Sequence, residues 1–175
     1  EKCMMTEKYI NMITDDECMI EFKKAFTHET VEKFDNYEFY ETLGDVTTNK
    51  VVVWYYNVRF SDLFKDNRSG GMGAVAIMAR LKQTGISKKT YSKFSRDLGF
   101  LEYVSCEERH KKENATKILE DVFEAFCGCL EFLIDKKVCN FAGYSIIYTF
   151  MKPLMDKEKI EISPEALYDA KTKLK

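Results

Sequence analysis

The chain has 175 residues, which is enough for one domain with a full hydrophobic core and short for two. Hydrophobic residues make up 45% and charged residues 32%, and the formal net charge of −2 excludes a strongly basic surface that would hold a polyanion by charge alone. No apolar run approaches the roughly 20 residues that cross a bilayer, and the first four residues lack the pattern of a signal peptide, so we expect no membrane partner.

Helices are predicted throughout, because only two prolines and eight glycines interrupt the chain and no alternating strand pattern occurs. Residues 2–13 are predicted to form a short amphipathic stretch. The T-D-D-E sequence at 14–17 is typical of a capping box and is expected to begin a helix that runs to Ala25 and Phe26. Residues 27–36 are polar and are predicted to form a loop.

A long, largely apolar helix is predicted from Tyr37 to about Phe60. Its V-V-V-W-Y-Y run at 51–56 is also compatible with a buried strand, but the length and the 3.6-residue period favour a helix, with the aromatic residues at core spacing. After this helix, a break is predicted at 67–71, followed by helices at 72–82 and 88–98 and a stop at Gly99. A charged connector is predicted at 106–114, followed by helices at 115–136 and 143–151, with Pro153 after the second of these. A further helix is predicted to begin at Ser163-Pro164. The predicted architecture is an all-α single domain.

Two groups of acidic residues lie far apart in the chain but have helical spacing. Glu38, Glu41 and Asp45 are at i, i+3 and i+7, and Asp121 and Glu124 are at i and i+3, so each group shares one helix face. Carboxylates buried in apolar helices are costly unless a cation meets them. We expect the two helices to cross and to bring four carboxylates to one point, those of Glu41, Asp45, Asp121 and Glu124. Oxygen ligands alone suit Mg²⁺ or Mn²⁺.

Other interpretations of these patterns stay open. The acids could form ion pairs between helices, and a generic helical metal-binding bundle is disfavoured because Glu-x-x-His pairs are missing.

The six cysteines show neither a C-x-x-C pair nor zinc spacing, and Cys127 and Cys129 are interpreted as small core residues. Reduced thiols suit an intracellular, reducing compartment, either cytoplasm or nucleus.

The acidic segments also resemble a known family. The sequence E-F-Y-E-T-L-G-D at 38–45 resembles the ribonuclease III and Dicer signature E-x-x-E-x-L-G-D, and D-V-F-E-A-F-C-G at 121–128 resembles the second motif of that family, D-x-F-E-A-x-x-G. Three shorter matches are A-F-T-H at 25–28, L-G-F-L-E-Y at 98–103 and D-A-K-T-K-L at 169–174. The matches occur in the family's order over residues 15–175.

This resemblance implies that residues 1–175 form one ribonuclease III-type helical endonuclease domain that holds one or two Mg²⁺ ions, with Mn²⁺ as an alternative. The implied catalytic residues are Glu41, Asp45, Asp121, Glu124 and Lys117. Lys117 matches a Dicer lysine and would neutralise the scissile phosphate or pair with a site carboxylate. The implied reaction is cleavage of double-stranded RNA, leaving 5′-phosphate and 3′-hydroxyl ends with 3′ overhangs.

Several residues are candidate RNA contacts. Glu38 would help to orient the metal shell or the RNA, although a solvated surface acid is the alternative. Lys111 and Lys112 lie in the basic sequence R-H-K-K at 109–112, and the lysines and arginine of 88–96 form a second basic group. An ordinary solvated face is the alternative for both groups. His28 is interpreted as a packing and capping residue.

One departure from the family concerns the dimer. The family places a phenylalanine that inserts into the partner subunit before Leu-Gly-Asp, and here that residue is Thr42. We still expect a homodimer through this helix, with Phe39, Val46 or Val53 compensating. A C-terminal double-stranded RNA-binding domain is expected to follow in the full-length protein. The alternative function is a non-catalytic ribonuclease III-like scaffold or dimer partner.

Overall fold

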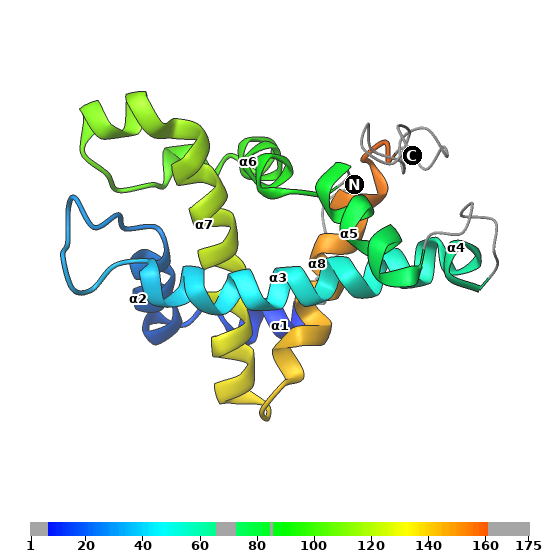
Figure 1. The fold of residues 1–175 in the computed structure, drawn as a ribbon. Helices are drawn as coiled ribbons and strands as arrows, with labels where there is room; N and C mark the ends of the chain where they lie inside the picture. Colours follow the sequence, from blue (N-terminus) through cyan, green and yellow to red (C-terminus); the bar gives the residue numbers. More distant parts are fainter. Residues whose placement is uncertain (1–6, 66–72, 85, 161–175) are drawn as a thin grey trace.

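Two long helices, α3 (Glu38–Arg59) and α7 (Glu108–Lys137), cross each other and carry the two acidic groups (Figure 1). The structure is a computed structural model that describes residues 7–65, 73–84 and 86–160. Within these ranges every regular element is helical, and an isolated bridge joins Thr27 to Ser105. The predicted all-α class is therefore confirmed.

Glycines allow α3 and α7 to approach within backbone contact. A Cβ atom on Gly44 would be 1.8 Å from the carbonyl oxygen of Glu124, and one on Gly128 would be 2.1 Å from the carbonyl oxygen of Tyr40. Glycine inside a helix costs about 1 kcal/mol relative to alanine. The two mid-helix glycines are explained by this crossing, where no other residue fits.

Several of the other helices pack on α7. The helix α2 (Asp16–Ala25) packs on it through Phe22 and Phe126, whose rings are 5.8 Å apart, and α6 (Lys88–Asp97) packs through Tyr91 and Phe123, whose rings are 5.0 Å apart. Four further helical segments are α1 (Glu7–Met12), α4 (Ser61–Lys65), α5 (Ala74–Thr84) and α8 (Ala142–Asp156), and η2 (Phe100–Glu102) is a short 3₁₀ turn. The core lies between α3, α7 and α8, which all contact one another.

Most of the predicted boundaries agree with the structure to within a few residues. The cap of α2 is Asp15, whose side chain accepts a hydrogen bond from the amide of Cys18 at 2.9 Å. Residues 27–36 form no helix, and the segment 51–56 is helical rather than extended. Gly99 ends α6 with a φ of 76°, a left-handed conformation that favours glycine.

Two predicted boundaries are wrong. The connector predicted over 106–114 is helical from Glu108, because the exposed Arg109–Glu113 ion pair at 3.1 Å supports a helix without an apolar stripe. A kink at Asn114, with φ −120° and ψ 19°, separates residues 108–113 from the buried part of α7. The last helix continues past Pro153 to Asp156, because the buried Leu154 and Met155 extend its apolar face and only the last turn loses a hydrogen bond.

Some sequence predictions fall outside the described residues, namely the break at 67–71, the helix start at Ser163-Pro164 and the match at 169–174. Cys127 and Cys129 are buried free thiols, as predicted. The aromatic group at 54–56 is divided, because Tyr55 and Tyr56 are buried while Trp54 is exposed. Among the described helices, none combines the length and apolar character that crossing a membrane requires.

Candidate metal centre

Three of the four predicted acids come together at the crossing of α3 and α7. Glu41, Asp121 and Glu124 each offer a carboxylate oxygen, and these atoms lie within 4.8 Å of one another. Glu124 is completely buried, Asp121 is buried, and Glu41 is partly buried. The Oε1 atom of Glu124 is buried without a hydrogen-bond partner among the described residues.

Burial makes this cluster unfavourable for negative charge without a cation. Burial raises the pKa of Glu124 to about 8, and the nearby Lys88 ammonium opposes the shift. Burial also raises the pKa of Glu41, and the charge of Asp121 adds to this effect. A divalent cation would remove the repulsion between these oxygens, and a buried oxygen without a partner on Glu124 fits a group that binds one. The donor set fits Mg²⁺ or Mn²⁺, which take carboxylate oxygens.

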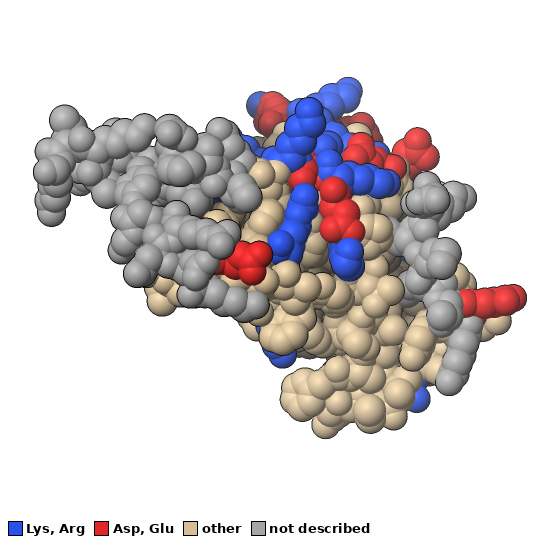
Figure 2. Space-filling view, turned by 90° about the vertical axis from the view of Figure 1, so that its right-hand side faces the viewer, with Lys and Arg blue, Asp and Glu red and all other residues tan. Residues whose placement is uncertain are grey.

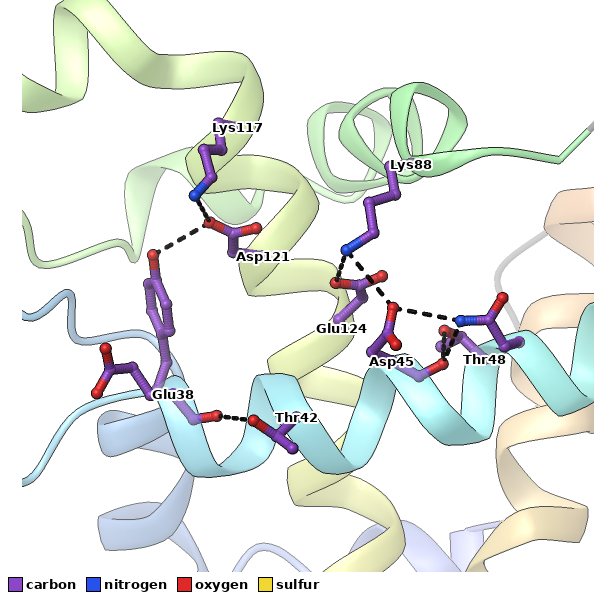
Figure 3. A network of polar contacts seen from close by, with 10 residues as sticks. Glu38, Thr42, Asp45, Thr48, Lys88, Lys117, Asp121 and Glu124 are labelled. Carbon is purple, nitrogen blue, oxygen red and sulfur yellow. Dashed lines mark hydrogen bonds and ion pairs between the residues drawn. The ribbon is translucent and has the colours of Figure 1, made fainter. Parts of the chain in front are cut away.

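Asp45, the fourth predicted acid, is not part of this group of three. Its Oδ1 atom is 3.5 Å from Nζ of Lys88, which is also 3.3 Å from Oε2 of Glu124 (Figure 3). The side-chain amide of Asn49 donates to the same Oδ1 atom at 3.2 Å, and Lys82 donates to Asn49 at 2.8 Å. Asp45 therefore joins the cluster only through Lys88 and Glu124.

Lys117 lies one turn before Asp121 on α7, as its spacing predicts. Its Nζ atom is 3.7 Å from Oδ2 of Asp121, and the side chain is 77% exposed. The hydroxyl of Tyr37 donates to the same Oδ2 atom at 3.4 Å. Burial raises the pKa of Tyr37, so this phenol stays protonated and acts as a donor. Asp121 is thus oriented by two groups, one buried and one facing solvent.

A small polar pocket of about 200 Å³ lies beside the cluster. Glu41, Asp121 and Lys117 line it together with the exposed Glu38, so the structure brings Glu38 to the edge of the site. His28 also lines it, and its buried ring packs on Tyr37 and accepts a hydrogen bond from the amide of Thr30 at 3.0 Å. Burial lowers the pKa of His28, which fits the predicted packing role.

The basic residues of 109–112 have different surroundings. Lys111 donates to the carbonyl oxygen of Val104 at 2.9 Å, so its ammonium supports the backbone of a loop. Lys112 is exposed. His110 packs against His28, with ring centroids 4.7 Å apart. Of the two lysines, Lys112 is the one whose side chain is fully available to a ligand.

Sequence reasoning missed three members of the site. Tyr37 and Asn49 carry no motif, and Lys88 was grouped with surface lysines although it reaches the buried Glu124. The one available signal was Ser87, whose capping box with Thr90 places Lys88 at the start of a helix. That signal does not say which way the helix points.

Comparison with known proteins identifies the family. No family model matches the chain. Two viral proteins that carry the ribonuclease 3 name, from Invertebrate iridescent virus 6 and Frog virus 3, are each 32% identical to it over 97% of its length. The chain belongs to the ribonuclease III family. The ribonuclease 3 of Streptococcus sanguinis is 29% identical over 94% of the chain.

The ribonuclease III fold is also found by structural comparison. Two structures of the ribonuclease III nuclease domain from Campylobacter jejuni superimpose with TM-scores of 0.62 and 0.60, at 22% and 23% identity. They cover 86% and 87% of this chain, and 96% and 94% of those domains. By contrast, the chain spans 60% and 44% of the lengths of the two viral relatives.

Membership of the ribonuclease III family explains the two glycines at the helix crossing. Gly44 belongs to the family signature at 38–45, and Gly128 closes the second motif at 121–128. Each meets the backbone of the other helix. The motif glycines therefore set the distance between the helices that carry the acids.

Proposed function

We propose that this chain is the nuclease domain of a magnesium-dependent endoribonuclease that cleaves double-stranded RNA. The observation that supports the proposal most is the carboxylate cluster of Glu41, Asp121 and Glu124, with oxygens within 4.8 Å and one buried oxygen lacking a partner. Membership of the ribonuclease III family supports double-stranded RNA as the substrate class. The products are proposed to have 5′-phosphate and 3′-hydroxyl ends with 3′ overhangs.

The proposed ligands are Glu41, Asp45, Asp121 and Glu124, with Mg²⁺ preferred and Mn²⁺ as an alternative. When bound, one or two such ions supply an activated water and stabilise charge on the leaving oxygen. Tyr37 orients Asp121 from the buried side. Lys117, whose side chain is mostly exposed beside Asp121, is proposed to neutralise the scissile phosphate.

Duplex RNA is proposed to be recognised by its A-form shape and its backbone rather than by sequence. Lys112 and Glu38 are proposed to contact the RNA at the rim of the site. Lys/Arg and Asp/Glu side chains are intermingled on the upper part of the face shown in Figure 2, so this face offers no uniformly basic surface. A double-stranded RNA-binding domain after residue 175 is therefore proposed to supply part of the affinity.

A homodimer through α3 is proposed to place two sites on one duplex. The outward face of this helix is apolar, with Phe39 61% exposed, Val46 65% and Val53 39%. Each is seven positions after the one before, which is close to two helical turns, so they form one stripe. The hydroxyl of Thr42 donates to the carbonyl oxygen of Glu38 at 2.9 Å, so this residue keeps its donor within the helix. The stripe can thus replace the phenylalanine that the family has at Thr42.

The test is cleavage of perfect duplex RNA by the full-length protein, with and without millimolar Mg²⁺. Glu124→Gln keeps the shape of the side chain but loses its charge, so cleavage should fall by at least about 100-fold, equal to about 2.7 kcal/mol. Circular dichroism should show an unchanged helical content. Undiminished cleavage by this variant would exclude the proposed metal centre.

The matched control is Glu131→Gln on the same helix. Glu131 is also a buried acid, but it accepts a hydrogen bond from Thr47 and lies outside the carboxylate cluster. This variant should cleave RNA at close to the wild-type rate. Calcium in place of Mg²⁺ should support RNA binding but poor cleavage, because its looser coordination positions the water less well.

A further inference from the structure

The ammonium group of Lys88 lies between two carboxylates of the proposed metal centre. Its Nζ atom is 3.5 Å from Oδ1 of Asp45 and 3.3 Å from Oε2 of Glu124 (Figure 3). The Glu124 side chain is completely buried, whereas that of Lys88 is 57% exposed. The lysine side chain can therefore swing away from both carboxylates into solvent while its helix stays in place.

The packing of α6 holds Lys88 in this position. Lys88 is the first residue of the helix, directly after the capping residue Ser87. One turn later, Tyr91 stacks on Phe123, the residue before Glu124. The hydroxyl of Ser95 donates to the carbonyl oxygen of Leu119 on α7 at 2.7 Å. Buried contacts along α6 thus fix its first turn beside the Glu124 carboxylate.

The two oxygens of Glu124 have different surroundings. Oε2 has the Lys88 ammonium as its partner, and the same ammonium binds Asp45. Oε1 has no hydrogen-bond partner among the described residues, although it is buried. Glu124 also belongs to the group of three carboxylates, with Glu41 and Asp121. The acids therefore divide into a group of three and the Asp45–Glu124 pair, which Lys88 bridges.

We infer that Lys88 is a built-in cation of the metal centre, which holds Asp45 and Glu124 in place without metal and competes with a divalent cation for them. This inference rests on the proposed function. A cation bound by Glu41, Asp121 and Glu124 would not need Asp45 as a ligand, whereas a cation bound by Asp45 would have to displace Lys88. Lys88 is thus a positioning residue. It sets the metal concentration at which a cation can bind Asp45.

The test is Mn²⁺ binding by the metal-free chain without RNA, measured by calorimetry and by electron paramagnetic resonance. Lys88→Gln should bind Mn²⁺ about five- to thirtyfold more tightly, the factors that correspond to about 1–2 kcal/mol. Lys88→Arg keeps the charge and should bind like the wild type. Lys89→Gln is the matched control, because Lys89 makes no ion pair with Asp45 or Glu124 in the described structure. In a Lys88→Gln background, Asp45→Asn should remove the gain.

Thermal unfolding separates competition from a purely structural role. Without metal, Lys88→Gln should unfold at a lower temperature, because two carboxylates lose their partner. Saturating Mn²⁺ should then raise its unfolding temperature by more than that of the wild type. If Lys88 has a structural role alone, Lys88→Gln should lower the unfolding temperature equally with and without Mn²⁺ and should leave the Mn²⁺ affinity unchanged.

The outcomes distinguish this inference from the proposed function. If the wild type binds Mn²⁺ and Lys88→Gln binds it equally or more weakly, competition by Lys88 is refuted and the metal centre remains. If neither protein binds Mn²⁺, the proposed metal centre fails and the role of Lys88 fails with it.

Discussion

Replacing Gly44 with alanine should move the proposed metal ligands apart, because this glycine lies where α3 meets α7. A Cβ atom there would be 1.8 Å from the carbonyl oxygen of Glu124, whereas real Cβ contacts are essentially never under 3.0 Å. The backbones would have to separate by about 1.2 Å, the difference 3.0 − 1.8 Å. Overpacking of this kind costs about 1–3 kcal/mol, of which the better helix propensity of alanine recovers at most about 1 kcal/mol.

The separation should affect function more than stability. Glu41 lies on α3 and Glu124 on α7, so the distance between their carboxylates changes with that between the helices. A misplacement of about 1 Å can cost about 100-fold in rate. Gly44→Ala should therefore bind Mn²⁺ more weakly and cleave duplex RNA about 100-fold more slowly, while urea unfolding shows only a moderate loss of stability.

Gly143→Ala is the matched control for this prediction. A Cβ atom on Gly143 would be 2.6 Å from the Cα and carbonyl oxygen of Glu131, so it overpacks the contact between α8 and α7, away from the acids. This variant should lose stability but keep its metal affinity and cleavage rate. Wild-type metal affinity and cleavage in Gly44→Ala, or equal losses in Gly143→Ala, would refute the role of the helix crossing.

The stability of the metal-free chain should fall with rising pH, since burial holds the pKa of Glu124 at about 8, above its ordinary value of 4.5. The stabilisation from the protonated form is complete below pH 4.5 and is lost as the pH rises through about 8. Thermal melts across this range should show a slope that Glu124→Gln reduces, and an equal slope in that variant would exclude this cause. Duplex RNA should bind residues 1–175 weakly and with strong salt dependence, because the net charge is −2, and tight binding at physiological salt in a filter assay would contradict this. Val46→Glu should convert the proposed α3 dimer to a monomer in sedimentation, while Val31→Glu, at an exposed loop position, should not. A wild-type chain that is monomeric at micromolar concentration would argue against this dimer.

The sequence predicted the two long helices because their buried residues repeat at helical spacing over many turns. It did not predict the start of α7, since residues 108–113 have no apolar stripe and are supported by the exposed Arg109–Glu113 pair. The end of α8 was missed because the rule that proline ends a helix was outweighed by the packing of Leu154 and Met155. Local patterns predict helix boundaries well where burial is periodic. They predict them less well where tertiary contacts or solvated ion pairs determine where a helix begins or ends.

The same reason explains which part of the candidate site the sequence could predict. Spacing places Glu41 and Asp45 on one face of a helix, but it says nothing about the neighbour that each will meet. The glycine crossing brings Glu41 to α7, whereas Asp45, four residues later, meets Lys88 at the start of α6. Lys88 is 36 residues from Glu124 in the sequence, so no local pattern connects them. If Lys88 competes with metal as inferred, the acids supply the metal ligands. A lysine that is distant in the sequence then sets the metal concentration at which these ligands are occupied.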